Sequence, residues 1–244
     1  MTTRVAFILD DIPGQTGSIP LDITSNEIAV ANIPGIIYWP YIDDIYGRVS
    51  GSSPQSLYDR MTDSYLGTVG AESFSITSLR DGTSAVVIGS QNTCWRSFVS
   101  TFNGGATFAA KVTGGIGISS HAAPTGSTFW IRNDTDGKLL FRVGEYTSTA
   151  DDYDGPLLTA GSVLSVVFCI DTLSGMVTIR VGTTYSRTFH INEIKGLVLH
   201  PAYQFGLVNN ENTLLLRPGN YGHILAFNGA LTSGEMDKLI SLMG

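Results

Sequence analysis

The order of hydrophobic and polar positions along the chain predicts many short strands. Apolar and polar residues alternate, or form short apolar runs, between turns rich in Gly, Asp and Asn, which is the pattern of β-strands. Strands at this spacing indicate an all-β sandwich or jelly roll. The clearest runs are 36–41, 74–79, 85–88, 129–132, 138–143, 163–170, 176–181, 185–191, 203–208 and 224–227.

Four of these runs form two pairs that are predicted to be β-hairpins. The first pair flanks a turn that ends in Asp136-Gly137, and Asp-Gly is a strong hairpin signal. The second pair flanks the turn from Asp171 to Gly175. In 163–170 the even-numbered residues are all apolar and the odd-numbered ones are mixed, so we expect one face of this strand to lie in the core.

The C-terminal segment has the period of an α-helix, and it is the only convincing helix in the sequence. Thr232 and Glu235 have the spacing of a capping box, and Leu231 can pack on Met236 as a hydrophobic staple. The apolar residues that follow recur at helical spacing and predict one buried face. They are Met236, Leu239, Ile240 and Met243. Together with the strands, this predicts a two-sheet antiparallel sandwich with one short C-terminal helix.

The first 34 residues read as a separate section. A short apolar run at 4–9 is followed by a turn-rich stretch with Pro13 and Pro20. We therefore divide the chain into an N-terminal arm or added strands, 1–34, and a sandwich, 35–244. An isolated strand is poorly stable, so the run at 4–9 is expected to add to the sheet edge of a neighbouring subunit or another protein. The alternative is an edge strand pair of the main domain.

Composition and charge exclude some classes of partner. The formal net charge of −7 argues against nucleic acid, because phosphate binding needs a basic surface. No apolar run reaches about 18 residues, so we expect no membrane span. The run from Val5 to Leu9 is too short for a signal-peptide core.

Cys94 and Cys169 can pair only once, and we expect two reduced thiols.

Three segments resemble laminin-G-like domains. The aromatic run 36–41, with the acidic turn and Gly47 after it, resembles their opening strand. The hairpin 166–181 resembles their central hairpin, although it lacks the usual Tyr-x-Asn-Gly turn and has Arg180 to Thr183 in its place. The segment 222–239 resembles their closing strand and helix. The resemblance implies the fold of the concanavalin A-like lectin and glucanase superfamily for about 35–244.

In that superfamily the first and last strands lie side by side. The resemblance therefore implies that 36–41 pairs near 224–227, with Tyr38, Trp39 and Tyr41 buried in the core. The alternative is an aromatic platform on which sugar rings stack. We favour the core, because aromatic residues that alternate along a strand are usually buried.

Residues with the pattern of a catalytic site are missing. The resemblance includes glucanases of this fold, which carry carboxylates in a Glu-x-Asp-x-x-Glu spacing. The full pattern does not occur in this sequence. Glycoside hydrolysis needs two carboxyl groups across the scissile bond, and Glu145, the nearest candidate, has no partner carboxylate after it. A Gly-x-Ser-x-Gly motif is also missing. We therefore expect that the protein is not an enzyme.

Two acidic turns are candidate calcium sites. Asp151, Asp152 and Asp154 place three carboxylates within four residues, and such a group is stabilised by a cation or by water. We take this turn as the candidate metal site, with calcium as the ion. The turn 133–137 is a second possibility, and a solvated acidic turn without an ion is the alternative for both. The four histidines have no zinc-ligand spacing.

The function that these features favour is a non-enzymatic module of a virus particle, from a bacteriophage tail, fibre or capsid decoration. Its expected partners are other virion proteins or copies of itself, for instance as a trimer, together with a glycan on the host surface. Its expected location is the virion, since no secretion signal is visible in the sequence. The alternatives are a cellular carbohydrate-binding module and a glycoside hydrolase with an atypical site. The ligand-binding residues cannot be named from the sequence.

Overall fold

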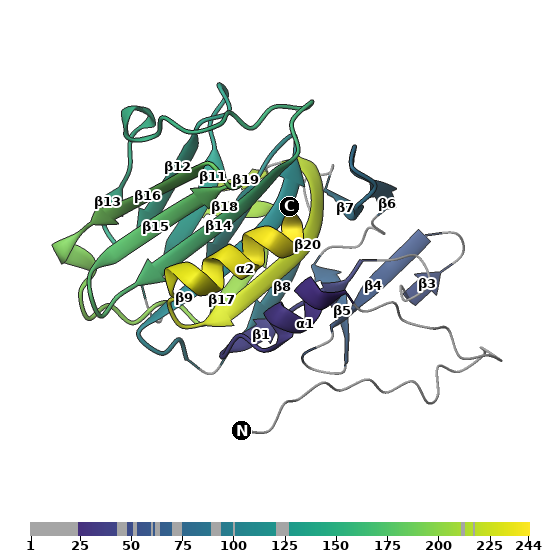
Figure 1. Cartoon of the computed structure of the whole chain (residues 1–244), viewed down its shortest axis with the longest axis horizontal. Helices are drawn as coiled ribbons and strands as arrows, with labels where there is room; N and C mark the ends of the chain where they lie inside the picture. Colours follow the sequence, from purple (N-terminus) through teal and green to yellow (C-terminus); the bar gives the residue numbers. More distant parts are fainter. Residues whose placement is uncertain are drawn as a thin grey trace.

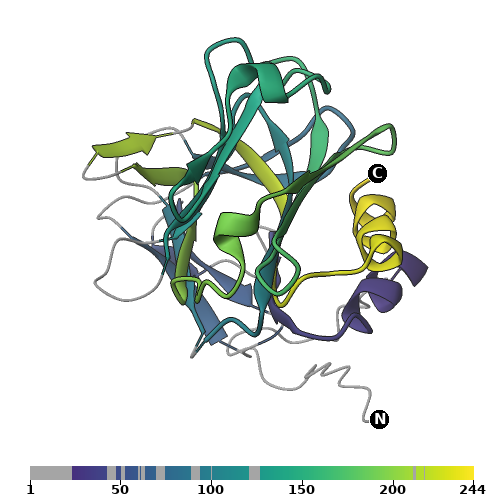
Figure 2. The same cartoon turned by 90° about the vertical axis from the view of Figure 1, so that its left-hand side faces the viewer.

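The chain folds as two antiparallel β-sheets packed face to face, as Figures 1 and 2 show. The structure is a computed structural model, and it describes residues 24–42, 48–50, 53–59, 61, 64–69, 75–88, 94–99, 101–120, 127–210, 213–216 and 218–244. Two helices lie on the outside of one sheet, and a two-stranded hairpin stands out from the other. The predicted antiparallel sandwich is therefore confirmed.

The first sheet has eight strands among the described residues. Its central strand β20 pairs with β9 on one side and with β7 on the other, and β14 continues the sheet beyond β9. In spatial order the strands are β16 (Tyr185–His190), β15 (Met176–Val181), β14 (Leu164–Asp171), β9 (Gly105–Thr113), β20 (Gly219–Asn228), β7 (Ser84–Ile88) and β6 (Ser75–Ser78), with β1 (Ile36–Tyr38) paired to β20.

The second sheet has ten strands among the described residues, and a separate hairpin lies against it. In spatial order its strands are β13 (Tyr146–Thr147), β12 (Leu139–Val143), β11 (Phe129–Asn133), β10 (Gly117–Ser120), β17 (Ala202–Phe205), β8 (Cys94–Phe98), β5 (Ser64–Val69), β4 (Ser53–Asp59) and β2 (Pro40–Tyr41), with β3 (Arg48–Ser50) paired to β4. The hairpin consists of β18 (Leu207–Asn210) and β19 (Thr213–Leu216).

The core between the sheets consists of side chains at alternate positions of facing strands. Phe108 of β9 and Phe129 of β11 stack with their ring centroids 5.0 Å apart. Tyr203 of β17 lies 5.4 Å from Phe108, and all three rings are fully buried. Aromatic pairs in this geometry stabilise a core beyond the area that they bury. The alternation that predicted the strands therefore also identifies the face that packs inward.

Helix α2 (Ser233–Met243) has the start that the sequence predicts. Thr232 Oγ1 accepts a hydrogen bond from the Glu235 backbone N–H at 3.3 Å, and Glu235 Oε2 accepts one from the Thr232 N–H at 2.8 Å. Its predicted apolar face is buried against the outer side of the eight-stranded sheet. The second core that results contains Ala109, Val167, Cys169, Leu225, Phe227, Met236, Leu239, Ile240 and Met243.

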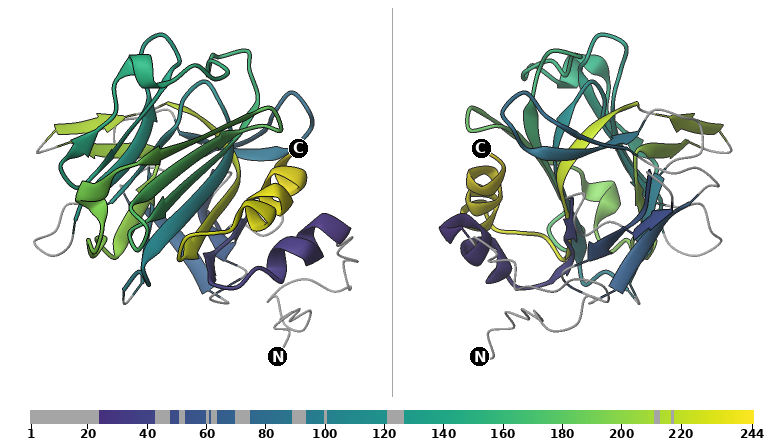
Figure 3. Two further views of the ribbon diagram at one scale, coloured as in Figure 1. Left: turned by 60° about the vertical axis from the view of Figure 1, so that its left-hand side comes forward. Right: turned by 90° about the vertical axis from the view of Figure 1, so that its right-hand side faces the viewer.

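A second helix, α1 (Ser25–Ala31), was not predicted. It has the same capping box, with Thr24 in the place of Thr232 and Glu27 in the place of Glu235. α1 lies beside α2 (Figure 3), and Val30 is fully buried in the same second core. The end of the predicted arm therefore packs on the sandwich of its own chain. The run at 4–9 lies outside the described residues, so its contact with another subunit stays a prediction.

The predicted pairing of the first and last strands is confirmed. Ile36 of β1 lies opposite Phe227 of β20, and Tyr38 lies opposite Ala226. Tyr38 is 1% exposed in the core between the sheets, and Trp39 is 3% exposed under the helices. Both are therefore core residues and not a platform for sugars; the side chain of Tyr41 lies outside the described residues.

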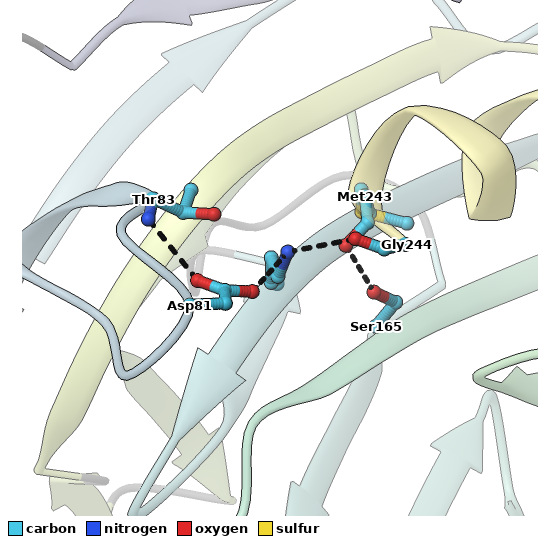
Figure 4. A network of polar contacts seen from close by, with 6 residues as sticks. Asp81, Thr83, Ser165, Met243 and Gly244 are labelled. Carbon is cyan, nitrogen blue, oxygen red and sulfur yellow. Dashed lines mark hydrogen bonds and ion pairs between the residues drawn. The ribbon is translucent and has the colours of Figure 1, made fainter.

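A polar network fastens the end of α2 to the sheet (Figure 4). Lys111 of β9 is almost completely buried, and its Nζ lies 2.5 Å from Asp81 Oδ2 in the turn between β6 and β7. The same ammonium group donates to the Gly244 carbonyl oxygen at 3.2 Å, and the Ser165 hydroxyl donates to the Met243 carbonyl oxygen at 2.9 Å. These bonds satisfy backbone carbonyls that the last turn of a helix leaves without intrahelical donors.

Cys169 is a free thiol on the helix side of β14. Burial raises the pKa of this thiol, and its Sγ lies 3.8 Å from the Leu231 carbonyl oxygen. A buried thiol with a raised pKa is mostly protonated and unreactive, which agrees with the expected reduced cysteine. The side chain of Cys94 lies outside the described residues. No helix in the described part of the chain is long and apolar enough to cross a membrane.

Candidate functional site

The candidate site lies at one edge of the sandwich, where the two sheets end. β16 is the last strand of the eight-stranded sheet on this side, and β13 is the last strand of the ten-stranded sheet. The chain that follows β13 passes through the short 3-10 helix η1 (Ala150–Asp152) and then runs beside β16. We name the polar and aromatic side chains gathered here the edge cluster: Tyr146, Asp152, Tyr153, Asp154, Tyr185 and Arg187.

Two of the three tyrosine rings of the edge cluster are in contact. The rings of Tyr153 and Tyr185 meet edge to face with their centroids 5.0 Å apart. Tyr153 is buried and its hydroxyl donates to the Pro156 carbonyl oxygen at 2.6 Å, whereas Tyr185 is only partly buried. A Cβ atom at Gly155 would lie 2.7 Å from the Tyr153 ring and 2.9 Å from the Tyr185 ring. Only glycine therefore lets the chain pass so close to both rings.

An exposed ion pair lies beside these rings. Arg187 Nη1 lies 3.4 Å from Asp154 Oδ1, and the two side chains are 38% and 77% exposed. The guanidinium group of Arg187 also lies 5.1 Å from the centroid of the Phe189 ring, which holds it against the edge of the sandwich. An ion pair this exposed stabilises the fold little, so its donors and acceptors remain available to a ligand.

The tyrosines of the edge cluster are neutral at physiological pH. Burial raises the pKa of Tyr153, and the nearby Tyr185 and Asp154 raise it further. Burial also raises the pKa of Tyr146 and of Tyr185, with smaller contributions from Asp152 and Asp154 respectively. A phenol that keeps its proton is a hydrogen-bond donor and acceptor, and a poor general base. The chemistry of the cluster therefore favours binding over catalysis.

The three aspartates of the predicted calcium site have different surroundings. Asp152 Oδ2 accepts hydrogen bonds from the Thr149 N–H at 2.7 Å and from its hydroxyl at 2.9 Å. Asp154 pairs with Arg187, and Asp151 is exposed. Among the described residues, no group of three or more His, Cys, Asp or Glu side chains is placed to hold a metal ion.

Calcium binding at this turn stays a prediction, and the ion would have to displace contacts of Asp152 and Asp154. In the second acidic turn, Asp134 Oδ1 already accepts from the backbone N–H groups of Asp136 and Lys138. Calorimetry with millimolar calcium tests the prediction, and a titration without heat would rule it out.

Glu145, the nearest candidate for a catalytic carboxylate, lies in the turn between β12 and β13. Its side chain is 99% exposed, and its Oε2 is 3.7 Å from Arg142 Nη2. A general acid in glycoside hydrolysis needs a raised pKa, which enzymes produce by burial or by a neighbouring carboxylate. Glu145 is exposed, and the neighbour that the described part of the chain places beside it is Arg142.

Four members of the edge cluster were not identified from the sequence: Tyr146, Tyr153, Tyr185 and Arg187. A signal was present in 185–190, where the larger residues Tyr185, Arg187 and Phe189 alternate with residues that are exposed in the structure. That alternation places them on one face of β16. It does not show that residues 146–154 cover that face, because their proximity comes from the packing of the two sheets.

Comparison with known proteins shows a shared fold. No protein family and no curated protein matches the sequence. One similar solved structure concerns botulinum neurotoxin type C, whose cell entry depends on interaction with two ganglioside molecules. Its TM-score is 0.56 at 10% identity, and the match covers 86% of this chain and 51% of that chain. The binding domain of Paraclostridial Mosquitocidal Protein 1 has a TM-score of 0.51 and 12% identity, over 86% of this chain and 52% of that one.

A third similar structure is the Trypanosoma rangeli sialidase in complex with sialic acid. Its TM-score is 0.57 at 12% identity, and the match covers 87% of this chain and 34% of the sialidase. This chain thus corresponds to about half or less of the length of each of these structures. At such low identities the likeness concerns the fold, and the chain shares with all three a β-sandwich.

Proposed function

We propose that this protein is a non-enzymatic glycan-binding module. The observation that carries the proposal is the edge cluster, in which the partly exposed Tyr185 lies beside an exposed pair of Arg187 and Asp154. Sugar rings bind proteins by packing their C–H faces on aromatic rings, while hydroxyl groups bond to charged and planar polar side chains. The cluster supplies both kinds of group at one edge of a rigid sandwich.

The similar structures support the class of ligand. One is named for two ganglioside molecules and another for a complex with sialic acid, and gangliosides and sialic acid are both glycan ligands. Those ligands belong to those proteins. For this chain they support a search among cell-surface glycans, with the edge cluster as the site to test.

The finer part of the proposal is that the module belongs to a bacteriophage particle, with other virion proteins or copies of itself as partners. Two features of the sequence support this part: the resemblance to laminin-G-like domains, and the N-terminal section, 1–34, that precedes the sandwich. The test is mass spectrometry of purified particles. Detection in stoichiometric amounts would support the proposal, and absence from the particles would favour a cellular carbohydrate-binding module.

The glycan proposal predicts that Arg187→Gln weakens binding. A glycan array identifies a binder, and calorimetry then gives its dissociation constant. Removing the guanidinium group takes away charge-assisted hydrogen bonds, each worth about 1.5–3 kcal/mol, so we expect the dissociation constant to rise about tenfold or more. Tyr185→Ala should have an effect in the same direction.

A matched control is available on the same strand. Ser186 is exposed and lies between Tyr185 and Arg187, and its side chain points to the opposite side of β16. Ser186→Ala should therefore leave binding unchanged. If the array shows no binder, or if Arg187→Gln binds as tightly as the unchanged protein, the edge cluster is not a glycan site.

We also predict that the protein hydrolyses no common β-glucan. The exposed position of Glu145 supports this, since its side chain lacks the burial that glycosidases use around their general acid. Reducing-sugar release is measured with the purified protein and with Glu145→Gln. Turnover that the substitution abolishes would show a glycoside hydrolase with an atypical site.

A further inference from the structure

A second group of polar side chains lies on the outer face of the ten-stranded sheet, away from the helices. Ser119 of β10 lies opposite Gln204 of β17 and opposite Trp130 of β11, and Trp130 lies opposite Arg142 of β12. Arg132 is two residues beyond Trp130 and therefore shares its face. We name these five residues the outer-face cluster. Residues before and after them, such as Phe129, Ile131 and Phe141, point into the core.

Three residues of the outer-face cluster are buried although they face away from the core. Ser119 and Gln204 are fully buried and Trp130 is 2% exposed. The Gln204 side-chain amide donates to the Ser119 hydroxyl at 3.1 Å. The hairpin of β18 and β19 stands out on this side of the sheet (Figures 2 and 3), and β18 lies near β10 and β11. This side of the sandwich thus shields polar groups from water.

Two hydrogen-bond donors of the cluster have no acceptor. Trp130 Nε1 and Arg132 Nε are both buried and both lack a hydrogen-bond partner within the described structure. They belong to residues that lie side by side, since the Arg132 guanidinium carbon is 5.1 Å from the Trp130 ring centroid. Buried N–H groups are nearly always satisfied in folded proteins. The missing partner has to be an acceptor, because both orphan groups are donors.

Arg132 also brings a positive charge to the cluster. Arg132 has no ion pair in the described part of the chain. Arg142, on the neighbouring strand of the same face, is a second arginine of the cluster, and its Nη2 lies 3.7 Å from Glu145 Oε2. The protein as a whole has a net charge of −7.

We propose that the outer-face cluster binds an oxyanion, namely a carboxylate or sulfate group such as acidic sugars carry. Arg132 supplies the charge and the Nε–H donor, and the Trp130 indole N–H supplies a second donor. A planar guanidinium group recognises carboxylates and sulfates through paired hydrogen bonds. This site lies on the outer face of the ten-stranded sheet, whereas Tyr146, the edge-cluster residue of that sheet, packs on Phe141 at its inner face. It is therefore separate from the edge cluster and independent of the proposed function.

The experiment follows the Trp130 indole N–H resonance by NMR, assigned by comparison with Trp130→Phe. Sodium sulfate, sodium glucuronate and glucose are titrated separately into the full chain at constant ionic strength. We expect a saturable shift with sulfate or glucuronate and none with glucose. Glucuronate binding assigns the site to a sugar carboxylate, and sulfate binding alone assigns it to sulfate groups. The absence of a saturable shift, or an equal response to glucose, would overturn the proposal.

Three variants connect the shift to this site. Arg132→Gln should raise the dissociation constant about tenfold or more, while Arg132→Lys, which keeps the charge, should restore part of the affinity. Arg187→Gln in the edge cluster should leave the titration unchanged, so this site and the glycan site can fail separately. The remainder of each amide spectrum shows that the variant is folded. Equal affinity for the anion in Arg132→Gln would overturn the proposal.

Discussion

Replacing Leu239 with alanine should lower the free energy of unfolding by about 2–5 kcal/mol, the range for removing a large buried aliphatic side chain. Leu239 is fully buried between α2 and the outer side of the eight-stranded sheet. Typical domains are stable by only about 5–15 kcal/mol, so one substitution in the terminal helix should remove a large part of the stability. Urea unfolding followed by circular dichroism measures the change.

The control for this substitution is its neighbour Lys238, which is exposed on the same helix. Lys238→Ala keeps the helical propensity and should change the stability by less than about 0.5 kcal/mol. If Leu239→Ala were as stable as Lys238→Ala, then α2 would not pack on the sheet in solution. That result would contradict the second core as described above.

Replacing Asp81 with asparagine should lower the stability at neutral pH by about 1–3 kcal/mol, the cost of leaving a buried group without its partner. Asp81 is the partly exposed partner of the buried Lys111 ammonium group in Figure 4. Asparagine has the same shape and can still accept the hydrogen bond from the Thr83 N–H. The change therefore removes the charge and leaves the turn intact.

The same pair makes the stability depend on pH. Burial disfavours the charged form of Asp81, but the hydrogen bonds from Lys111 and Thr83 outweigh it and lower the pKa from 3.8 to about 2. The folded pKa is below the unfolded one, so the stabilisation is complete above about pH 4 and is lost as the pH falls through 2. The stability of Asp81→Asn should lack this dependence, and the two proteins should approach each other in acid.

Denaturant unfolding between pH 2.5 and 7 measures this difference. Asp136→Asn is the matched control, because it removes the same charge from an exposed turn, and it should shift stability by less than about 0.5 kcal/mol. If Asp81→Asn kept full stability at pH 7, or if its deficit stayed constant down to pH 2.5, then Asp81 would not stabilise the buried Lys111 charge.

The strands were predictable because their signal is local. The predicted runs 163–170 and 176–181 became β14 and β15, and Asp171 accepts hydrogen bonds from the Leu173 and Ser174 N–H groups in the turn between them. A strand buried on one face has to show period-two alternation. The alternation was sufficient to predict a sandwich, whereas the pairing of β1 with β20 was predicted from the family resemblance.

Helix α1 was missed because its stability is not local. Seven residues are too few to show a helical period, and helices this short depend on tertiary contacts. Val30 and Ile33 are buried only because α2 and the sheet lie beside them. The capping box of Thr24 and Glu27 was the one local signal, and it has the same spacing as the box of Thr232 and Glu235 that predicted α2.

The composition of the edge cluster could not be predicted for a related reason. Asp152 is predicted to be a calcium ligand, and in the structure its carboxylate accepts hydrogen bonds from Thr149, three residues earlier. The residues that lie near it across the edge, Tyr185 and Arg187, are more than 30 positions away in the sequence. Their meeting depends on how two sheets close against each other, which no alternation pattern encodes.

The place of β20 has a consequence for how the chain folds. This strand joins β9 and β14 to β7, β6 and β1, and it follows every other strand in chain order. During synthesis β1, β6 and β7 therefore have no place in the sheet until residues 219–228 are made. Contacts between such distant segments make folding slow, on the order of milliseconds to seconds. Until then β1 lacks its partner strand and the hairpin of β6 and β7 has an open edge, so the nascent chain is most prone to aggregate just before its last strand appears.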